Sequence, residues 1–160
     1  NRLSPLERAL IKWCRVYDQD VLLVKAIIWH ETGNGRWFER NDSRRLHEQK
    51  WAIETVKKYK CDVRDPKVWY SIGHMQVLYL TALHYGYKGT PKGLHDINTN
   101  LKYGLEYLSD KRRVYWGKWH AVAAYNAGKV RLDYRGKYVN QAYVNSIKGK
   151  YYQLGGRDYE

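Results

Sequence analysis

The feature that most constrains this chain is an apolar run that ends in a carboxylic acid. The run extends from Val21 to Trp29, and Glu31 and Gly33 follow closely. It predicts a buried helix with Asp20 as its N-cap and Gly33 as its C-terminal stop. Apolar surroundings and the negative end of the helix macrodipole both oppose ionisation of a carboxyl group there. Glu31 is therefore a candidate general acid, with a solvated helix-end residue as the alternative.

The rest of the chain is typical of one globular domain. It has 160 residues, of which 44% are hydrophobic, so we predict a single domain over residues 1–160. No apolar stretch approaches the ~20 residues that a membrane-spanning helix needs. The first residues also lack the apolar region of a signal peptide.

The charge of the chain points to a polyanionic partner. Lys and Arg number 29 against 16 Asp and Glu, which gives a net charge of +13. Nucleic acid, an anionic membrane surface and an acidic cell-wall polymer all fit this charge. The 16 Tyr and seven Trp residues are many for this length: several would pack in the core, and an excess beyond core needs would suit stacking on sugar rings or nucleobases.

Cysteine and histidine residues give no metal-binding pattern. Cys14 and Cys61 have neither redox-motif nor zinc-site spacing, and both a disulfide and two reduced thiols stay open. The six His residues are scattered along the chain. We expect no metal and no cofactor.

Hydrophobic spacing predicts helices throughout, without convincing alternating strands or internal repeats. The first helix begins at a capping box formed by Ser4 and Glu7, with Pro5 at its first position. Predicted helices cover about 5–17, 21–31, 43–60, 73–85, 97–108, 119–128 and 143–151, with a turn at 65–66, a loop at 87–93 and a basic loop at 129–138. We predict a compact all-α domain, in which an N-terminal helix within 1–20 precedes a core over 21–151.

Three segments, in order, resemble one enzyme family, the lytic transglycosylases. Glu31-Thr32 resembles the Glu-Ser pair that ends the family's catalytic helix, and Ser71-Ile72-Gly73-His74-Met75-Gln76 resembles its Ser-x-Gly-Leu-Met-Gln segment. Ala124-Tyr125-Asn126-Ala127-Gly128 matches the family's Ala-Tyr-Asn-Ala-Gly outright. Residues 94–108 are similar to the linking helix, and Tyr143-Val144 resembles the Tyr-Val pair that closes the site. Each motif alone is weak, but their joint occurrence in order is specific.

The chain also departs from the family pattern. His74 replaces the usual Leu, and Thr32 replaces the usual Ser. The stretch between Glu31 and Ser71 is longer than in the shortest members, although Trp37-Phe38-Glu39-Arg40 resembles a stretch found in some, phage members included. The insertion concerns the substrate-facing wall rather than the acid.

The resemblance implies a lysozyme-like helical fold with a substrate groove. It also implies cleavage of the β-1,4 bond between N-acetylmuramic acid and N-acetylglucosamine in peptidoglycan. Glu31 would protonate the glycosidic oxygen with assistance from the substrate's acetamido group. It would then take a proton from the C6 hydroxyl, which closes a 1,6-anhydro ring. Such substrate assistance needs no second carboxylate, and no motif here pairs one with Glu31.

The predicted site therefore has one catalytic residue, Glu31, and a set of substrate-binding residues: Ser71, Met75, Gln76, Tyr125, Asn126 and Tyr143. Gln76 and Asn126 have amide groups that can bond acetamido or hydroxyl groups, or serve as structural bonds. Ser71 would orient Glu31 or cap a helix that starts near Gly73.

The other predicted site residues also have structural alternatives. Met75 and Tyr125 would line the sugar groove or pack in the core. Tyr143 would hydrogen-bond Glu31 or be an ordinary core tyrosine. His30 lies about 100° from Glu31 around the helix, so we assign it no catalytic role.

Three other functions remain open at this stage. A hydrolytic muramidase would need a carboxylate that positions water, for which Glu39 and Asp42 are candidates. A nucleic-acid-binding domain fits the charge but leaves the Glu31 segment unexplained. An inactive wall-binding remnant, such as a virion protein, is favoured by His74.

We expect the partners to be peptidoglycan glycan strands and anionic cell-wall or envelope polymers, without specific nucleic-acid binding and without a transmembrane segment. Basic residues are spread over several segments rather than gathered in one recognition helix: 44–45, 57–58, 111–113 and 148–150. The expected location is extracytoplasmic, in the periplasm or cell wall, or in a phage virion.

Overall fold

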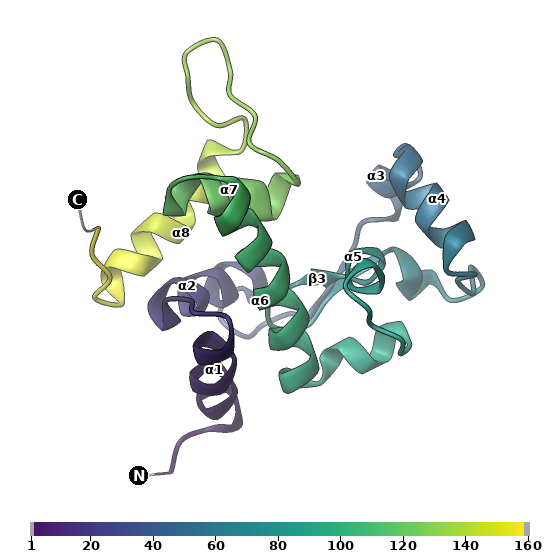
Figure 1. Ribbon diagram of the computed structural model, residues 1–160, viewed down its shortest axis with the longest axis horizontal. Coiled ribbons are helices and arrows are strands. Elements are labelled where there is room, and N and C mark those ends of the chain that lie inside the picture. Colours follow the sequence, from purple (N-terminus) through teal and green to yellow (C-terminus); the bar gives the residue numbers. More distant parts are fainter. Residues whose placement is uncertain (1, 159–160) are drawn as a thin grey trace.

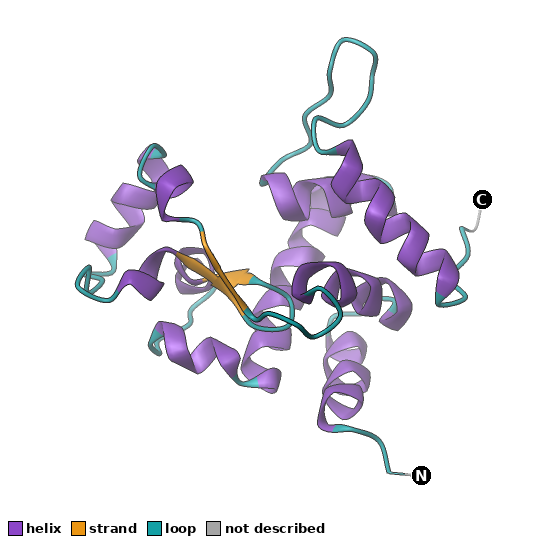
Figure 2. Ribbon diagram, turned by 180° about the vertical axis from the view of Figure 1, so that it is seen from behind, coloured by secondary structure: helices purple, strands orange, loops and turns teal. Residues whose placement is uncertain are grey.

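The computed structural model describes residues 2–158. Most of these residues are helical, and a small sheet lies among the helices (Figures 1 and 2). The α-helices are α1 (Pro5–Val16), α2 (Val21–Thr32), α3 (Ser43–Leu46), α4 (Lys50–Lys58), α5 (Tyr79–His84), α6 (Ile97–Val114), α7 (Lys118–Ala127) and α8 (Gln141–Gln153). Short 3-10 helices are η1 (Pro66–Trp69) and η2 (Pro91–His95). The predicted helical fold is confirmed.

Helix α2 is the buried centre of one half of the molecule. Its apolar side chains Leu23, Val24 and Ile27 have no exposed surface, and the helix packs against α8 and α1. Burying one such side chain stabilises the fold by roughly 1.5–3 kcal/mol. Asp20 accepts a hydrogen bond from Leu22 N–H at its start, and Gly33 ends it in the left-handed conformation, as predicted.

The long helix α6 connects the two halves of the molecule. It packs against α1 and α7 on one side and contacts η2 and β3 on the other. In Figure 1, α7 and α8 lie on one side of α6, while α3, α4 and α5 lie on the other. The predicted basic loop between α7 and α8 projects away from the helices (Figure 1).

A three-stranded antiparallel sheet corrects the prediction that strands are missing. It consists of β1 (Glu39–Asn41), β2 (Tyr70–Ile72) and β3 (Val77–Leu78), in the order β1-β2-β3. The strands are two or three residues long, which is too short for a recognisable alternation of polar and apolar residues. Moreover, β1 pairs with β2 across the whole intervening insertion, with Arg40 opposite Ser71.

The predicted helix over 73–85 begins only at Tyr79, because the preceding residues form a tight turn. Gly73 and Gln76 have φ angles of +82° and +48°, which no α-helix contains. The buried Asn100 side chain fixes this turn: its Nδ2 donates to Ile72 O at 2.7 Å, and its Oδ1 accepts from Met75 N–H at 2.8 Å. A Cβ on Gly73 would collide with the Asn100 amide, so this turn needs glycine.

The predicted helix over 43–60 is also divided, into α3 and α4. Leu46 and Ala52 are both completely buried, yet in one continuous helix their side chains would point about 120° apart. An extended Gln49, with φ −111° and ψ 120°, breaks the helix between them. The break lets both side chains face the core, and the ring of His47 packs 4.0 Å from that of Trp69.

Two further observations complete the fold. Cys14 and Cys61 are both free, and burial raises the pKa of the Cys14 thiol to about 11. Within residues 2–158, every helix is too short or too polar to cross a membrane.

Candidate active site

Glu31 lies in the last turn of α2 with 8% of its surface exposed. Burial raises the pKa of its carboxyl group to about 7, which is the effect expected from the apolar helix. Two charged neighbours act in opposite directions: Arg40 lowers the pKa and Asp42 raises it. A large fraction of Glu31 is therefore protonated at neutral pH.

Glu31 faces a cavity of about 360 Å³ that lies between the two halves of the molecule. One wall comes from α6, α7 and the end of α2, and the opposite wall comes from the sheet, α5 and the segment that contains α3 and α4. The lining residues that also belong to the predicted site are Glu31, Ser71, Gln76, Tyr125 and Asn126. Segments far apart in the sequence thus meet at one carboxylic acid.

Beside Glu31, the cavity wall contains a polar network that the sequence did not reveal. Arg40 Nε donates to Asp42 Oδ1 at 3.0 Å, and Ser71 Oγ donates to Asp42 Oδ2 at 2.6 Å. The pairing of β1 with β2 brings these side chains together. Because Asp42 is buried and bonded to both groups, it holds the Arg40 guanidinium at the Glu31 cavity.

Ser71 neither caps a helix nor contacts Glu31 through a direct hydrogen bond. No helix starts at Gly73, so the helix-capping alternative is wrong. Its hydroxyl bonds Asp42 and accepts a long contact of 3.5 Å from Arg40 Nη2. Any effect of Ser71 on Glu31 therefore passes through Asp42 and Arg40.

Gln76 and Asn126 present amide groups to the cavity from opposite walls. Gln76 Nε2 donates to Gly73 O at 3.0 Å, which leaves its carbonyl oxygen without an intramolecular partner among the described residues. Asn126 is exposed, and its Oδ1 accepts from Asn140 Nδ2 at 2.9 Å, so its NH₂ group is available to a ligand.

Tyr125 and Met75 differ in their access to the cavity. Tyr125 lines it, and its hydroxyl donates to Met75 O at 2.6 Å, which fixes the ring. Met75 is completely buried and packs against Gly104, where a Cβ would meet its sulfur. The side chain of Met75 thus packs behind the cavity wall, as the structural alternative expects.

Tyr143 is buried next to Glu31 but makes no hydrogen bond to it. Its hydroxyl is buried and has no partner among the described residues. Burial, followed by the nearby charge of Glu31, raises its pKa well above 10. The ring packs edge-on against His30, with the two centroids 4.8 Å apart. His30 Nδ1 lies 2.8 Å from Ser146 Oγ on α8, and His30 does not line the Glu31 cavity.

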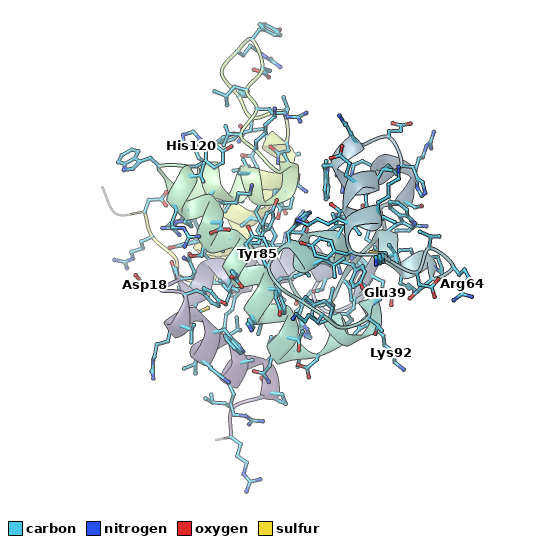
Figure 3. All side chains as sticks on the ribbon, turned by 45° about the vertical axis from the view of Figure 1, so that its right-hand side comes forward. Asp18, Glu39, Arg64, Tyr85, Lys92 and His120 are labelled. Carbon is cyan, nitrogen blue, oxygen red and sulfur yellow. The ribbon has the colours of Figure 1, made fainter. Side chains whose placement is uncertain are left out.

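The two candidates for a second carboxylate lie in different surroundings. Glu39 does not line the cavity; it pairs with Lys67 and with His95, whose Nε2 lies 2.8 Å away. These partners lower its pKa. In Figure 3, Glu39 lies on the right-hand side, while the cavity residue Tyr85 lies near the centre of the molecule. Asp42 is near enough to act on Glu31, but its oxygens are engaged by Ser71 and Arg40.

His74, where the family usually has Leu, lies outside the Glu31 cavity. It lines a second cavity of about 390 Å³ with Phe38, whose ring centroid is 4.9 Å from that of His74. Among residues 2–158, no three His, Cys, Asp or Glu side chains are grouped as a metal site would require.

The network around Arg40 and the clamp at Asn100 are the main features that the sequence did not predict. Arg40 stands in the Trp37–Arg40 stretch, whose pairing partner cannot be read from the sequence. Asn100 is a polar residue in the buried stripe of α6, next to the completely buried Leu101. A buried polar residue within an apolar stripe needs a hydrogen-bond partner. The polar residue in this stripe was therefore the sequence feature from which a structural role for Asn100 could have been predicted.

Comparison with known families identifies the class of this domain. The profile of the transglycosylase SLT domain family matches residues 9–147, and the chain belongs to this family. The predicted family and the lysozyme-like fold are confirmed. A search of curated proteins found no matching sequence. Membership establishes, in general terms, a peptidoglycan-directed domain of the lytic transglycosylase type.

Proposed function

We propose that this domain cleaves the β-1,4 bond between N-acetylmuramic acid and N-acetylglucosamine and leaves a 1,6-anhydro product. The observation that carries the proposal is the position of Glu31, buried at a helix end and open to the cavity, with a pKa raised to about 7. An acid with this pKa is suited both to donate a proton and to accept one near neutral pH.

The reaction uses Glu31 twice. In the first step, its proton goes to the glycosidic oxygen as the bond from that oxygen to C1 of muramic acid breaks, and the substrate's acetamido oxygen stabilises C1. In the second step, the C6 hydroxyl oxygen attacks C1, and its proton returns to the Glu31 carboxylate. No water is consumed, and the carboxyl group ends in its starting protonation state.

Arg40 has a defined part in this cycle. When Glu31 gives up its proton, the resulting carboxylate lies near the Arg40 guanidinium, which favours the charged form. Burial opposes that charge, so the two effects keep the two protonation states close in free energy. Asp42 and Ser71 act as positioning residues because they hold Arg40 rather than touching Glu31.

Substrate would bind along the same cavity. The free carbonyl of Gln76 and the NH₂ group of Asn126 suit the acetamido and hydroxyl groups of the sugars. Tyr125 offers a ring that its own hydrogen bond holds in place. Met75 and Tyr143 would support this surface from behind, since both are buried and neither lines the cavity.

A hydrolytic muramidase is the second candidate, because Asp42 is close enough to influence Glu31. An inverting hydrolase would hold its water with a carboxylate ~6.5–9.5 Å from the acid. The bonds from Asp42 to Ser71 and Arg40 leave it poorly placed to do so. His74 does not weaken either candidate, since it faces the second cavity.

We also propose that residues 1–160 form one domain that acts outside the cytoplasm or in a phage virion. The net charge of +13 would attract it to anionic wall or envelope polymers. This binding should weaken as salt rises, because exposed charges are screened beyond ~10 Å at 0.1 M.

Digestion of purified peptidoglycan, followed by mass spectrometry of the products, tests the proposed reaction. The expected products end in 1,6-anhydromuramic acid and lack reducing ends at that sugar. Products with free reducing ends would identify a muramidase instead, with Glu31 as its acid.

A further inference from the structure

Part of the cavity is built by the segment between β1 and β2, which contains α3 and α4. Arg45 lies on α3, Gln49 at the break between the helices and Trp51 on α4, and all three line the same cavity as Glu31. His84 and Tyr85, at the end of α5, complete this wall. This segment therefore contributes to the surface that a bound glycan would meet.

This wall has an excess of positive charge. Arg45 and Arg40 both face the cavity, and the same carboxylate, Asp42, lies beside both guanidinium groups. Asp42 bonds Arg40 at 3.0 Å, whereas its nearest approach to Arg45 is 3.9 Å, and the Arg45 side chain is 51% exposed. One carboxylate cannot neutralise two guanidinium groups, so Arg45 retains charge and hydrogen-bond donors for a ligand.

Two aromatic residues, Tyr107 and Trp51, line the same cavity as Arg45. The Arg45 guanidinium is near enough to act electrostatically on the hydroxyl of Tyr107. Tyr107 lines the cavity from α6, on the opposite side. Trp51 bonds Gln49 through its indole N–H at 2.5 Å, which fixes the ring at the rim. A ligand bound in this cavity beside Glu31 would therefore meet aromatic rings as well as the guanidinium of Arg45.

We propose that Arg45 binds a carboxylate of the peptide stem attached to the muramic acid residues of the glycan. The proposal rests on the proposed function and names the part of the substrate that the α3–α4 segment recognises. The sugars themselves are uncharged in stem-bearing chains, because the lactyl carboxyl group of muramic acid is amide-linked to the stem, and the amides of Gln76 and Asn126 suit them. The stem provides carboxylates on the same chain, and the planar guanidinium fork matches a carboxylate in geometry as well as charge.

The test compares stem-bearing glycan chains with bare chains, whose stems have been removed by an amidase and whose freed lactyl carboxylates have then been converted to amides. Both are prepared free of phosphate polymers. For the unmodified domain, we expect kcat/KM to be about tenfold higher on the stem-bearing chains, as for a charge-assisted hydrogen bond. Arg45→Gln should abolish this preference and leave kcat/KM on bare chains within about twofold. Arg44→Gln is the matched control, because Arg44 is an exposed neighbour on the same helix that does not line the cavity.

A binding measurement separates this inference from the proposed reaction. In a Glu31→Gln background, isothermal titration with stem-bearing oligosaccharide should show about tenfold weaker binding when Arg45→Gln is added, and no change when Arg44→Gln is added. Equal affinities with and without Arg45, or an equal loss on bare and stem-bearing chains, would overturn the inference. Digestion without anhydro products, with stem binding intact, would instead refute the proposed reaction alone.

Discussion

The two walls of the cavity are held together in different ways. The wall that contains Glu31 includes the end of the apolar helix α2, and burial is the main influence on the pKa of its carboxyl group. The opposite wall, from the sheet, α3 and α4, is polar and is ordered by hydrogen bonds among Arg40, Asp42 and Ser71. The difference indicates that the first wall sets the chemistry, while the second adjusts the acid and recognises the substrate.

The largest effect is expected from Glu31→Gln. The change keeps the shape of the side chain and removes the proton that the reaction needs, so the rate of cell-wall cleavage should fall by ~10² or more. Turbidity clearing of purified walls measures the rate, and circular dichroism checks that the fold is retained. A variant that clears walls at nearly the normal rate would refute the role of the first wall.

The same substitution should change the pH dependence of stability. Folding raises the pKa of Glu31 from 4.5 to about 7, so the folded state holds the proton more tightly than the unfolded chain. The folded state therefore loses stability as pH rises from about 4.5 to 7, by up to about 3 kcal/mol. Glu31→Gln should lose most of this dependence in denaturation measurements, whereas the exposed Glu48→Gln should keep it.

A smaller effect is expected when the second wall is changed. Asp42 raises the pKa of Glu31, so Asp42→Asn should move the alkaline fall of kcat/KM to lower pH and reduce the rate at pH 7 several-fold. Arg40 lowers that pKa, so Arg40→Gln should move the fall to higher pH. Shifts in the same direction for both variants would contradict the assigned network.

The smallest effect is expected at Glu39. Its partners Lys67 and His95 lie outside the cavity, so Glu39→Gln should leave the rate on cell walls within about twofold. Loss of activity in this variant, together with reducing ends in the normal products, would assign a catalytic role to Glu39 and support a muramidase.

The two walls also differ in how far the sequence predicts them. The apolar run, Asp20 and Gly33 specify α2 locally, and this placed Glu31 correctly at the end of a buried helix. Residues 124–128 likewise lie at the end of a helix that was correctly predicted. Here local propensity and hydrophobic periodicity agree with the final structure.

The second wall could not be derived in the same way, because it depends on contacts between distant residues. The pairing of Arg40 with Ser71 and the clamp of Asn100 on the turn at Gly73 both join segments far apart in the chain. Local spacing favoured a helix from Gly73, and these tertiary contacts overrode it. The role of Arg40 follows from strand register, which the sequence of a three-residue strand does not fix.

The central claim is that burial keeps a large fraction of Glu31 protonated near neutral pH. The most direct measurement is an NMR titration of the ¹³C-labelled carboxyl group of Glu31, assigned by its absence in Glu31→Gln. We predict a midpoint near pH 7, in agreement with the raised pKa of about 7. A midpoint near 4.5, the ordinary value for glutamate, would contradict this account of the active site.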